Sequence, residues 1–117
     1  MGRLTTHILD TAGGCPASGV KIDLFSVEDG GGLMNLTSVI TNNDGRVDGP
    51  VVEGDQFQAG VYELHFHVGE YFRRVFTPVG QSFLDVVPVR FGISVVDEHY
   101  HVPLLVSPFG YSTYRGS

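Results

Sequence analysis

Short stretches in which apolar and polar residues alternate are the feature that most limits what this chain can fold into. Residues 4–10 and residues 20–27 both follow a two-residue period. This period is typical of a β-strand with one buried and one exposed face. Clusters rich in glycine, asparagine, aspartate and proline, which favour tight turns, interrupt the pattern at residues 11–16, 29–32 and 42–45. The sequence therefore predicts an all-β protein.

The remaining stretches indicate how the strands are arranged. Helical spacing of apolar residues occurs only in residues 70–76, which predicts one short helix. About eight short strands in a chain of this length are typical of two packed sheets. We expect a two-sheet, eight-stranded antiparallel sandwich that forms one domain over residues 1–117. Further β-rich stretches are residues 36–41, 61–68, 83–96, 99–106 and 109–115.

Charge and cysteine content narrow the partners and the compartment. The formal net charge is -6, and no cluster of lysine and arginine is present, so nucleic acids and anionic membranes are disfavoured as partners. Cys15 is the one cysteine and cannot form an internal disulfide, which favours a cytoplasmic location. The first twenty residues have neither the apolar core of an export signal nor a membrane span. Exposed edges of a sandwich are often protected by pairing with a second copy, so we expect a symmetric assembly.

Four of the five histidines form two His-x-His pairs, His65 with His67 and His99 with His101. Residues two apart in a strand point to the same side, so each pair could present two imidazoles to zinc. No second metal-ligand motif supports that hypothesis. For the first pair we favour the exposed face of a strand. His101 begins an apolar run and is either packed and hydrogen-bonded or kept for its titration near neutral pH. On residue chemistry alone packing is favoured, and the same applies to His7.

Two further features suggest a binding site. Arg46 directly follows the turn at residues 42–45. It is either an ordinary surface arginine or a clamp for a planar, carbonyl-rich or anionic ligand, because a guanidinium presents its donors in a fixed fork. The polar run 111–117 holds two tyrosines and an arginine after an apolar stretch. Chain ends are usually frayed, so this composition indicates that the end is folded into a site.

Four segments together resemble the transthyretin-like family of 5-hydroxyisourate hydrolases, and the resemblance spans the whole chain. The last two segments are the most specific, because transthyretin, the hormone carrier with the same fold, differs at those positions. The segments are Leu-Thr-Thr-His-Ile-Leu-Asp-Thr at 4–11 with Gly-Cys-Pro-Ala at 14–17, Thr-Asn-Asn-Asp-Gly-Arg at 41–46, His-Tyr-His-Val-Pro-Leu-Leu at 99–105, and Tyr-Arg-Gly-Ser at 114–117.

The resemblance implies an eight-stranded sandwich with one short helix, assembled as a homotetramer in which two dimers pack face to face. It implies hydrolysis of a purine-derived substrate, 5-hydroxyisourate, to 2-oxo-4-hydroxy-4-carboxy-5-ureidoimidazoline in urate degradation, without metal or organic cofactor. The sites would lie in the channel between the dimers. By motif, the catalytic residues are His7, Arg46 and His101, and the residues that bind substrate and shape the pocket are Tyr114, Arg115, Gly116 and Ser117.

Two other functions remain as alternatives at this point. The first is a transthyretin-like carrier that holds a small aromatic ligand in the intersubunit channel without turning it over. Residues 114–117 would narrow such a channel and exclude a long ligand with two aromatic rings. The second is metal binding through the His-x-His pairs. The resemblance also allows a periplasmic or peroxisomal location, because relatives occur in those compartments as well as in the cytosol.

Overall fold

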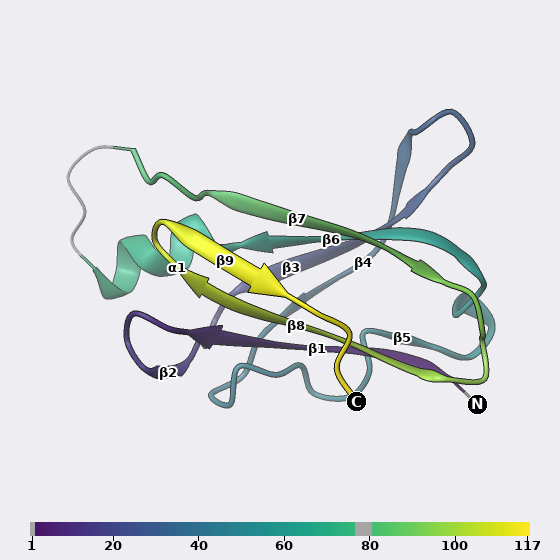
Figure 1. Cartoon of the computed structure of the whole chain (residues 1–117), viewed down its shortest axis with the longest axis horizontal. Helices are drawn as coiled ribbons and strands as arrows, with labels where there is room; N and C mark the ends of the chain where they lie inside the picture. Colours follow the sequence, from purple (N-terminus) through teal and green to yellow (C-terminus); the bar gives the residue numbers. More distant parts are fainter. Residues whose placement is uncertain (1, 77–80) are drawn as a thin grey trace.

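The computed structural model of the chain describes residues 2–76 and 81–117 and confirms the predicted all-β sandwich with one α-helix. Figure 1 shows the strands in two layers, with the helix at one end of the molecule. No helix among the described residues is long and apolar enough to cross a membrane. In chain order the elements are β1 (Arg3–Asp10), β2 (Cys15–Pro16), β3 (Lys21–Val27), β4 (Leu33–Ile40), β5 (Val52–Glu53), the 3-10 helix η1 (Gly54–Gln56), β6 (Gly60–His67), α1 (Val68–Val75), β7 (Val86–Ile93), β8 (His99–Ser107) and β9 (Gly110–Thr113).

The strands form one five-stranded and one four-stranded sheet. In the first sheet the order is β2-β1-β8-β9, and β5 pairs with the beginning of β1. In the second sheet the order is β4-β3-β6-β7. The predicted number of eight strands was close, but β2 and β5 are two residues long and too short to show a period in the sequence.

The inner faces of the two sheets build the core, as the alternation predicts. Along β1, Leu4, Thr6 and Ile8 are buried, whereas Thr5 and His7 are half-buried on the outer face. Alternating residues of β3, β6, β7 and β8 supply much of the rest of the core, and α1 adds to it. Residues with an exposed fraction of 0% are Leu4, Ile8, Ala17, Ile22, Leu24, Leu64, Phe66, Val68, Leu104 and Val106.

The expectation of a purely antiparallel sandwich was wrong for the centre of the first sheet. There β1 and β8 run parallel, with Thr5 opposite His101 and His7 opposite Pro103. A hairpin joins neighbouring antiparallel strands, but a parallel pair needs a long crossover. Here the intervening chain, which includes the entire second sheet, is that crossover. The parallel pair therefore places β1 and β8, which are far apart in the sequence, side by side in the first sheet.

The helix begins two residues earlier than predicted, at Val68 rather than Glu70. Pairing of β6 with β7 ends at His67, and the backbone N–H of Gly69 then donates to the carbonyl of Asp85 at 2.8 Å. A Cβ at position 69 would clash with Asp85, so glycine lets the helix start against the strand. The alternation in the sequence extends to Val68 because this first residue of the helix is also buried in the core.

A buried carboxylate joins β1 to the helix. Asp10 has an exposed fraction of 2%. Its Oδ1 accepts hydrogen bonds from the backbone N–H groups of Ala12 at 3.0 Å and Gly13 at 2.8 Å, and its Oδ2 accepts one from the Tyr71 hydroxyl at 2.9 Å. Burial and the Asp10 contact raise the pKa of Tyr71, so its hydroxyl stays a donor. The carboxylate thus satisfies three donors at the end of β1.

We expect Asp10→Ala to lower the free energy of unfolding by about 2–4 kcal/mol, because three donors lose their acceptor in a buried site. Tyr71→Phe should cost about 1–2 kcal/mol, since it removes one of the three hydrogen bonds. Urea denaturation followed by circular dichroism, at fixed protein concentration, measures both changes. The control is Asp55→Ala, at an exposed position, which should change stability by less than about 0.5 kcal/mol. An Asp10→Ala protein as stable as this control would show that the Asp10 carboxylate does not stabilise the fold.

Candidate functional site

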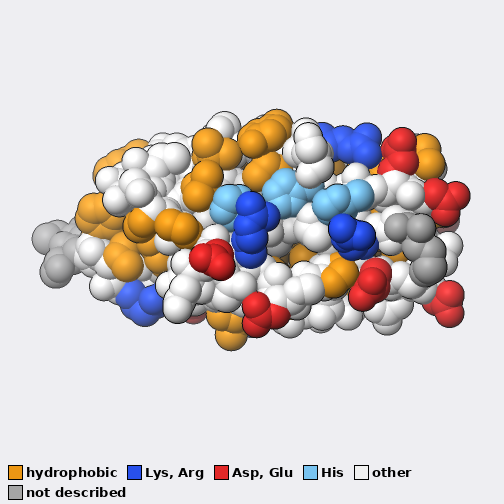
Figure 2. Space-filling view, turned by 90° about the horizontal axis from the view of Figure 1, so that it is seen from below, with side chains coloured by type: hydrophobic (Ala, Val, Ile, Leu, Met, Phe, Trp, Pro, Cys, Tyr) orange, Lys and Arg blue, Asp and Glu red, His pale blue; other side chains and the backbone are white. Residues whose placement is uncertain are grey.

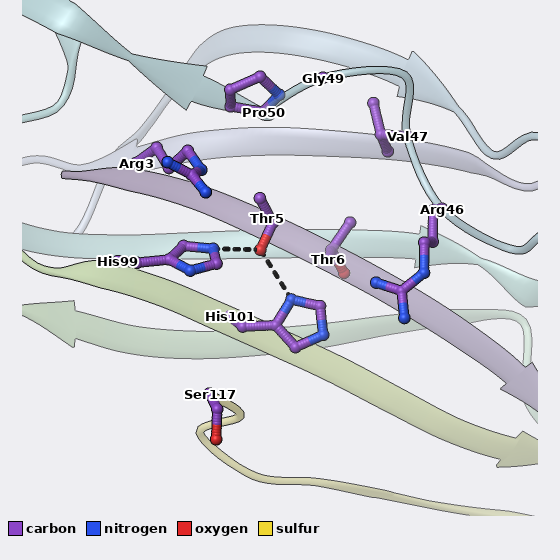
Figure 3. Close-up of a pocket in the computed structure, with 10 residues that line it drawn as sticks. All are labelled: Arg3, Thr5, Thr6, Arg46, Val47, Gly49, Pro50, His99, His101 and Ser117. Atoms are coloured by element: carbon purple, nitrogen blue, oxygen red, sulfur yellow. Dashed lines mark hydrogen bonds between the residues drawn. The ribbon is translucent and has the colours of Figure 1, made fainter. Parts of the chain in front are cut away.

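A cleft of about 410 Å³ lies on the outer face of the five-stranded sheet. Figure 3 shows that its walls come from β1, β8, the segment after β4 and the C-terminal segment. Four parts of the chain that are distant in sequence therefore meet at one place. The lining residues are Arg3, Thr5, Thr6, Arg46, Val47, Gly49, Pro50, His99, His101 and Ser117.

The turn before Arg46 is built to lie against β1. The Oδ1 of Asn42 accepts a hydrogen bond from the backbone N–H of Arg46 at 3.2 Å, and Gly45 has a φ of 71°. The carbonyl of Gly45 accepts a hydrogen bond from the N–H of Ile8 at 2.9 Å, and a Cβ at position 45 would clash with the Ile8 carbonyl. Glycine is required here both for its conformation and for this close approach. The result is a backbone bridge between Arg46 and His7.

The two arginines expected at the site lie in different surroundings. Within residues 2–76 and 81–117, the guanidinium of Arg46 makes no hydrogen bond or ion pair, so its donors are available to a ligand. Arg115 instead lies 4.1 Å above the Tyr100 ring and 3.3 Å from Glu98 Oε1, and it donates to the carbonyl of His99 at 3.3 Å. With Tyr114 it lines a separate hollow between β7 and β8. In one chain, Tyr114 and Arg115 are therefore away from the cleft.

The last residues of the chain lie directly on His101. The backbone N–H of Gly116 donates to the carbonyl of His101 at 2.8 Å, and this bridge continues the register of β9 along β8. A Cβ on Gly116 would be 2.6 Å from Cδ2 of the His101 ring, so the tail can approach this closely only as glycine. Ser117 then forms part of the cleft wall.

The structure brings His7 and His101 together, although His7 is not among the residues that line the cleft. Their ring centroids are 6.4 Å apart, so the rings do not bond to each other directly, and a water between them can reach both. Figure 2 shows histidine side chains gathered on this face, with basic side chains beside them. Of the seven residues predicted for the site, His7, Arg46, His101, Gly116 and Ser117 are thus neighbours.

Burial and the Arg46 charge keep both imidazoles neutral. Burial lowers the pKa of His7, and the Arg46 guanidinium lowers it further, against an opposing effect of Asp44. Burial also lowers the pKa of His101, followed by the charges of Arg46, His7 and His99. Both pKa values lie below the ordinary histidine value of about 6.5. At neutral pH each ring therefore has one nitrogen able to accept a proton.

Seven residues that line the cleft were not predicted for this site, and the polar ones closest to His101 are Thr5 and His99, of which His99 was considered only as a metal ligand. The Oγ1 of Thr5 is 2.7 Å from Nε2 of His99 and 2.7 Å from Nδ1 of His101. The signal was present, because alternation places Thr5 on the face of His7 and places His99 on the face of His101. What the sequence lacked was the pairing of β1 with β8, which sets Thr5 between the two rings.

The other His-x-His pair lies on the outer face of the four-stranded sheet, as predicted. His65 Nε2 is 2.7 Å from Glu63 Oε1, and His67 Nε2 is 2.7 Å from Asp23 Oδ2. These contacts pair each imidazole with a carboxylate of its own. Among the described residues no group of three or more histidine, cysteine or acidic side chains is arranged to hold a metal ion.

The fold and the cleft define a class of protein: a two-sheet sandwich that presents two neutral imidazoles and a guanidinium on the outer face of one sheet. The sequence profile of the HIUase/Transthyretin family matches residues 4–116. The chain belongs to this family, and the resemblance found in its motifs is confirmed.

Similar proteins of known sequence and structure agree with this assignment. The 5-hydroxyisourate hydrolase 2 of Rhizobium meliloti (strain 1021) is 59% identical over 117 residues, which cover 99% of this chain and 97% of that protein. The crystal structure of (S)-allantoin synthase matches with a TM-score of 0.91 and 49% identity, over 99% of this chain and 44% of that chain. The structure of Klebsiella pneumoniae 5-hydroxyisourate hydrolase matches with a TM-score of 0.82 and 34% identity, over 100% of both chains.

Replacing Arg46 tests the electrostatics of the site. We expect Arg46→Gln to raise the pKa of both His7 and His101 toward about 6.5, because the substitution removes a positive charge that disfavours their protonated forms. Titration of the histidine ring protons by NMR measures the change. The signals of His65 and His67, on the opposite sheet, serve as internal controls. Unchanged midpoints for both His7 and His101 would show that the guanidinium does not act on these rings.

Proposed function

We propose that this chain is a cyclic amide hydrolase that converts 5-hydroxyisourate to 2-oxo-4-hydroxy-4-carboxy-5-ureidoimidazoline in urate degradation. The observation that carries the proposal is the convergence of His7, His101 and the unpaired Arg46 guanidinium on one face of the sheet. These are the groups that hydrolysis of an amide requires: a base for water and a donor for the oxyanion. The 59% identity to a 5-hydroxyisourate hydrolase supports the choice of substrate.

The first step is attack of water on the C6 carbonyl of the six-membered ring. His7 and His101 orient the water, and an unprotonated imidazole nitrogen takes its proton as the new C6–O bond forms. The carbonyl electron pair moves to the oxygen. Positioned general-base help of this kind is worth about 10²- to 10⁴-fold in rate. Because both imidazoles are neutral at physiological pH, the base is ready without prior deprotonation.

Arg46 stabilises the oxyanion that this attack creates. Its guanidinium has no partner among the described residues, so its donors can meet the developing charge without breaking an existing ion pair. One such donor contributes roughly 3–4 kcal/mol when water is excluded. The same charge keeps the imidazoles neutral, so Arg46 serves the base and the oxyanion together.

Collapse of the tetrahedral intermediate completes the reaction. The C6–N1 bond breaks, N1 takes the proton held by the imidazolium, and C6 becomes the carboxyl group of the product. Water supplies all the atoms that are added, and no electrons are exchanged with another reactant. The proposed chemistry therefore uses neither a metal nor an organic cofactor.

We further propose a homotetramer, with two dimers packed face to face over the outer surface of the five-stranded sheet. The cleft lies on this surface and is open in the single chain. Strand β9 is exposed along its whole length, and Phe109 and Tyr114 beside it have exposed fractions of 77% and 61%. A second copy would cover these side chains. Tyr114 and Arg115 would then act on substrate across the interface.

A cytoplasmic location is part of the same proposal. Its support is Cys15, which is exposed and free in the structure. A reducing compartment keeps such a thiol unoxidised.

The direct test generates 5-hydroxyisourate with urate oxidase and follows its ultraviolet absorbance with and without the protein. We expect decay well above the spontaneous rate, because the cleft supplies both base and oxyanion donor. Decay at the spontaneous rate would reject the enzyme. Light scattering on the same sample should give the mass of four chains, and a monomer mass would reject the assembly. Stoichiometric binding of an aromatic ligand without turnover would support the carrier alternative.

Single substitutions test the assigned roles. We expect His101→Asn to lower kcat by about 10²- to 10⁴-fold, because the amide has no group at the position of Nε2. Arg46→Gln should lower kcat by about 10²- to 10³-fold through the lost oxyanion donor. His65→Asn and Arg90→Gln, which make the same changes on the other sheet, are the controls and should keep the rate. If either site variant retains the rate while its mass by light scattering is unchanged, that residue leaves the mechanism.

A further inference from the structure

Thr5 and His99 have no assigned role, yet they touch the proposed base. We infer that they are positioning residues for His101 and that the three side chains form one chain of hydrogen bonds. This inference rests on the proposed function, in which His101 is a base. In this chain the Nδ1–H of His101 donates to Thr5 Oγ1, and the Thr5 hydroxyl donates its own hydrogen to Nε2 of His99. The Nε2 of His101 is left unprotonated and faces the cleft. We call these three groups the Thr5 relay.

The inference starts from a count of hydrogens. Thr5 Oγ1 is 2.7 Å from a nitrogen of each histidine, and both contacts have the length of hydrogen bonds. A threonine hydroxyl has one hydrogen to donate. It can therefore donate to at most one of the rings, so at least one ring must carry the hydrogen of its own bond. Three orders satisfy this condition. In two of them Nδ1 of His101 carries the hydrogen, and in the third the hydroxyl donates to Nδ1, so that Nε2 carries it.

Contacts on both sides of the His101 ring determine which atoms meet the cleft. Nδ1 is held by Thr5, and the Cδ2 edge lies against Gly116 so closely that a Cβ there would be 2.6 Å away. These two ring atoms flank the attachment point of the side chain. The outer nitrogen, Nε2, is thereby left on the open end of the ring, which Figure 3 shows on the side of Arg46.

The Arg46 guanidinium favours an unprotonated Nε2 over a protonated one. A guanidinium has only donors, so an Nε2–H on that side would set donors against donors. With the hydrogen on Nδ1 instead, the lone pair of Nε2 faces the positive charge. Hydrogen on Nδ1 also leaves Nε2, the atom that must take a proton from water, free to do so. Both considerations place the hydrogen on Nδ1 of His101. Of the two orders that do so, only donation to Nε2 of His99 gives the Thr5 hydroxyl hydrogen an acceptor among the described residues.

A neutral relay suits this site better than a carboxylate would. In catalytic triads a buried carboxylate holds the histidine tautomer, but its charge also favours the protonated ring. Here the acceptor for Nδ1–H is an uncharged hydroxyl, so the tautomer is fixed without raising the pKa of His101. The hydroxyl is in turn oriented by His99, which is on the same strand and face as His101. His101 thus stays neutral, and its ring is held with Nε2 toward the cleft.

The tautomer can be measured on the protein without substrate. Long-range ¹H–¹⁵N NMR correlation of the histidine rings, at a pH above the ordinary histidine pKa, distinguishes protonated from unprotonated ring nitrogens. We expect His101, assigned by the loss of its signals in His101→Asn, to be protonated at Nδ1 and not at Nε2. In Thr5→Val we expect Nε2 to become protonated in a substantial share of molecules. A wild-type His101 protonated at Nε2 would overturn the inference.

Kinetics supply the second readout. Thr5→Val should lower kcat by about 10- to 100-fold with KM changed by less than about threefold, because the base is misoriented while substrate contacts remain. Thr5→Ser keeps the hydroxyl and His99→Gln can keep an acceptor, so both should stay within about threefold of the wild-type kcat. His99→Leu should behave as Thr5→Val does. Thr11→Val is the matched control, because its hydroxyl bonds the Val106 carbonyl at 3.2 Å and does not line the cleft.

The possible results separate the relay from the proposed function. Full kcat in Thr5→Val overturns the relay, as does an equal loss in Thr5→Ser, which would point to packing rather than hydrogen bonding. If wild-type protein shows the expected tautomer but does not accelerate 5-hydroxyisourate decay, the hydrogen-bond order stands and the proposed function is rejected. Circular dichroism melting of each variant identifies one that has failed to fold, and Thr5→Ser then decides the outcome alone.

Discussion

The parallel pairing of β1 with β8 is the constraint on which the rest of the site depends. It sets Thr5 opposite His101 and carries His7 on the same outer face. Because side chains alternate along a strand, a shift of either strand by one residue would exchange its inner and outer faces. Fully buried Leu4 and Leu104 oppose such a shift, since both would lose their place in the core. The apolar interior therefore determines the positions of the polar groups outside it.

Secondary contacts on either side of this strand pair complete the arrangement. On one edge the turn at residues 42–45 bridges to β1 and brings Arg46, and on the other edge the C-terminal segment bridges to His101. The site is thus formed by neighbouring backbone segments, and each segment contributes one or two functional groups. A chain with a net charge of -6 carries at this place a guanidinium, which has no partner among the described residues, and neutral rings. That local excess of donors suits a small, carbonyl-rich ligand more than a cation.

Much of this could be predicted from the sequence, for identifiable reasons. Alternation gave the faces of β1 and β6 correctly, and the Asn-Asn-Asp-Gly cluster gave the turn before Arg46. The parallel pair could not be predicted, because it joins residues more than ninety positions apart and leaves no local signal. The contacts of Arg115 within one chain could not be predicted for a similar reason. Its contacts with Tyr100 and Glu98 come from β8 and the loop before it, and no spacing within residues 114–117 reveals them.

The clearance around Gly116 bears on how variation in this protein is interpreted. That residue has no functional group, yet its missing side chain is what allows the backbone to rest on the His101 ring. A side chain at this position would displace the ring or the backbone, so the lack of one is a spatial requirement of the site. A deep mutational scan scored only by growth on the substrate would rank this glycine with the histidines. Only a separate measurement of abundance would tell a spatial requirement from a chemical one.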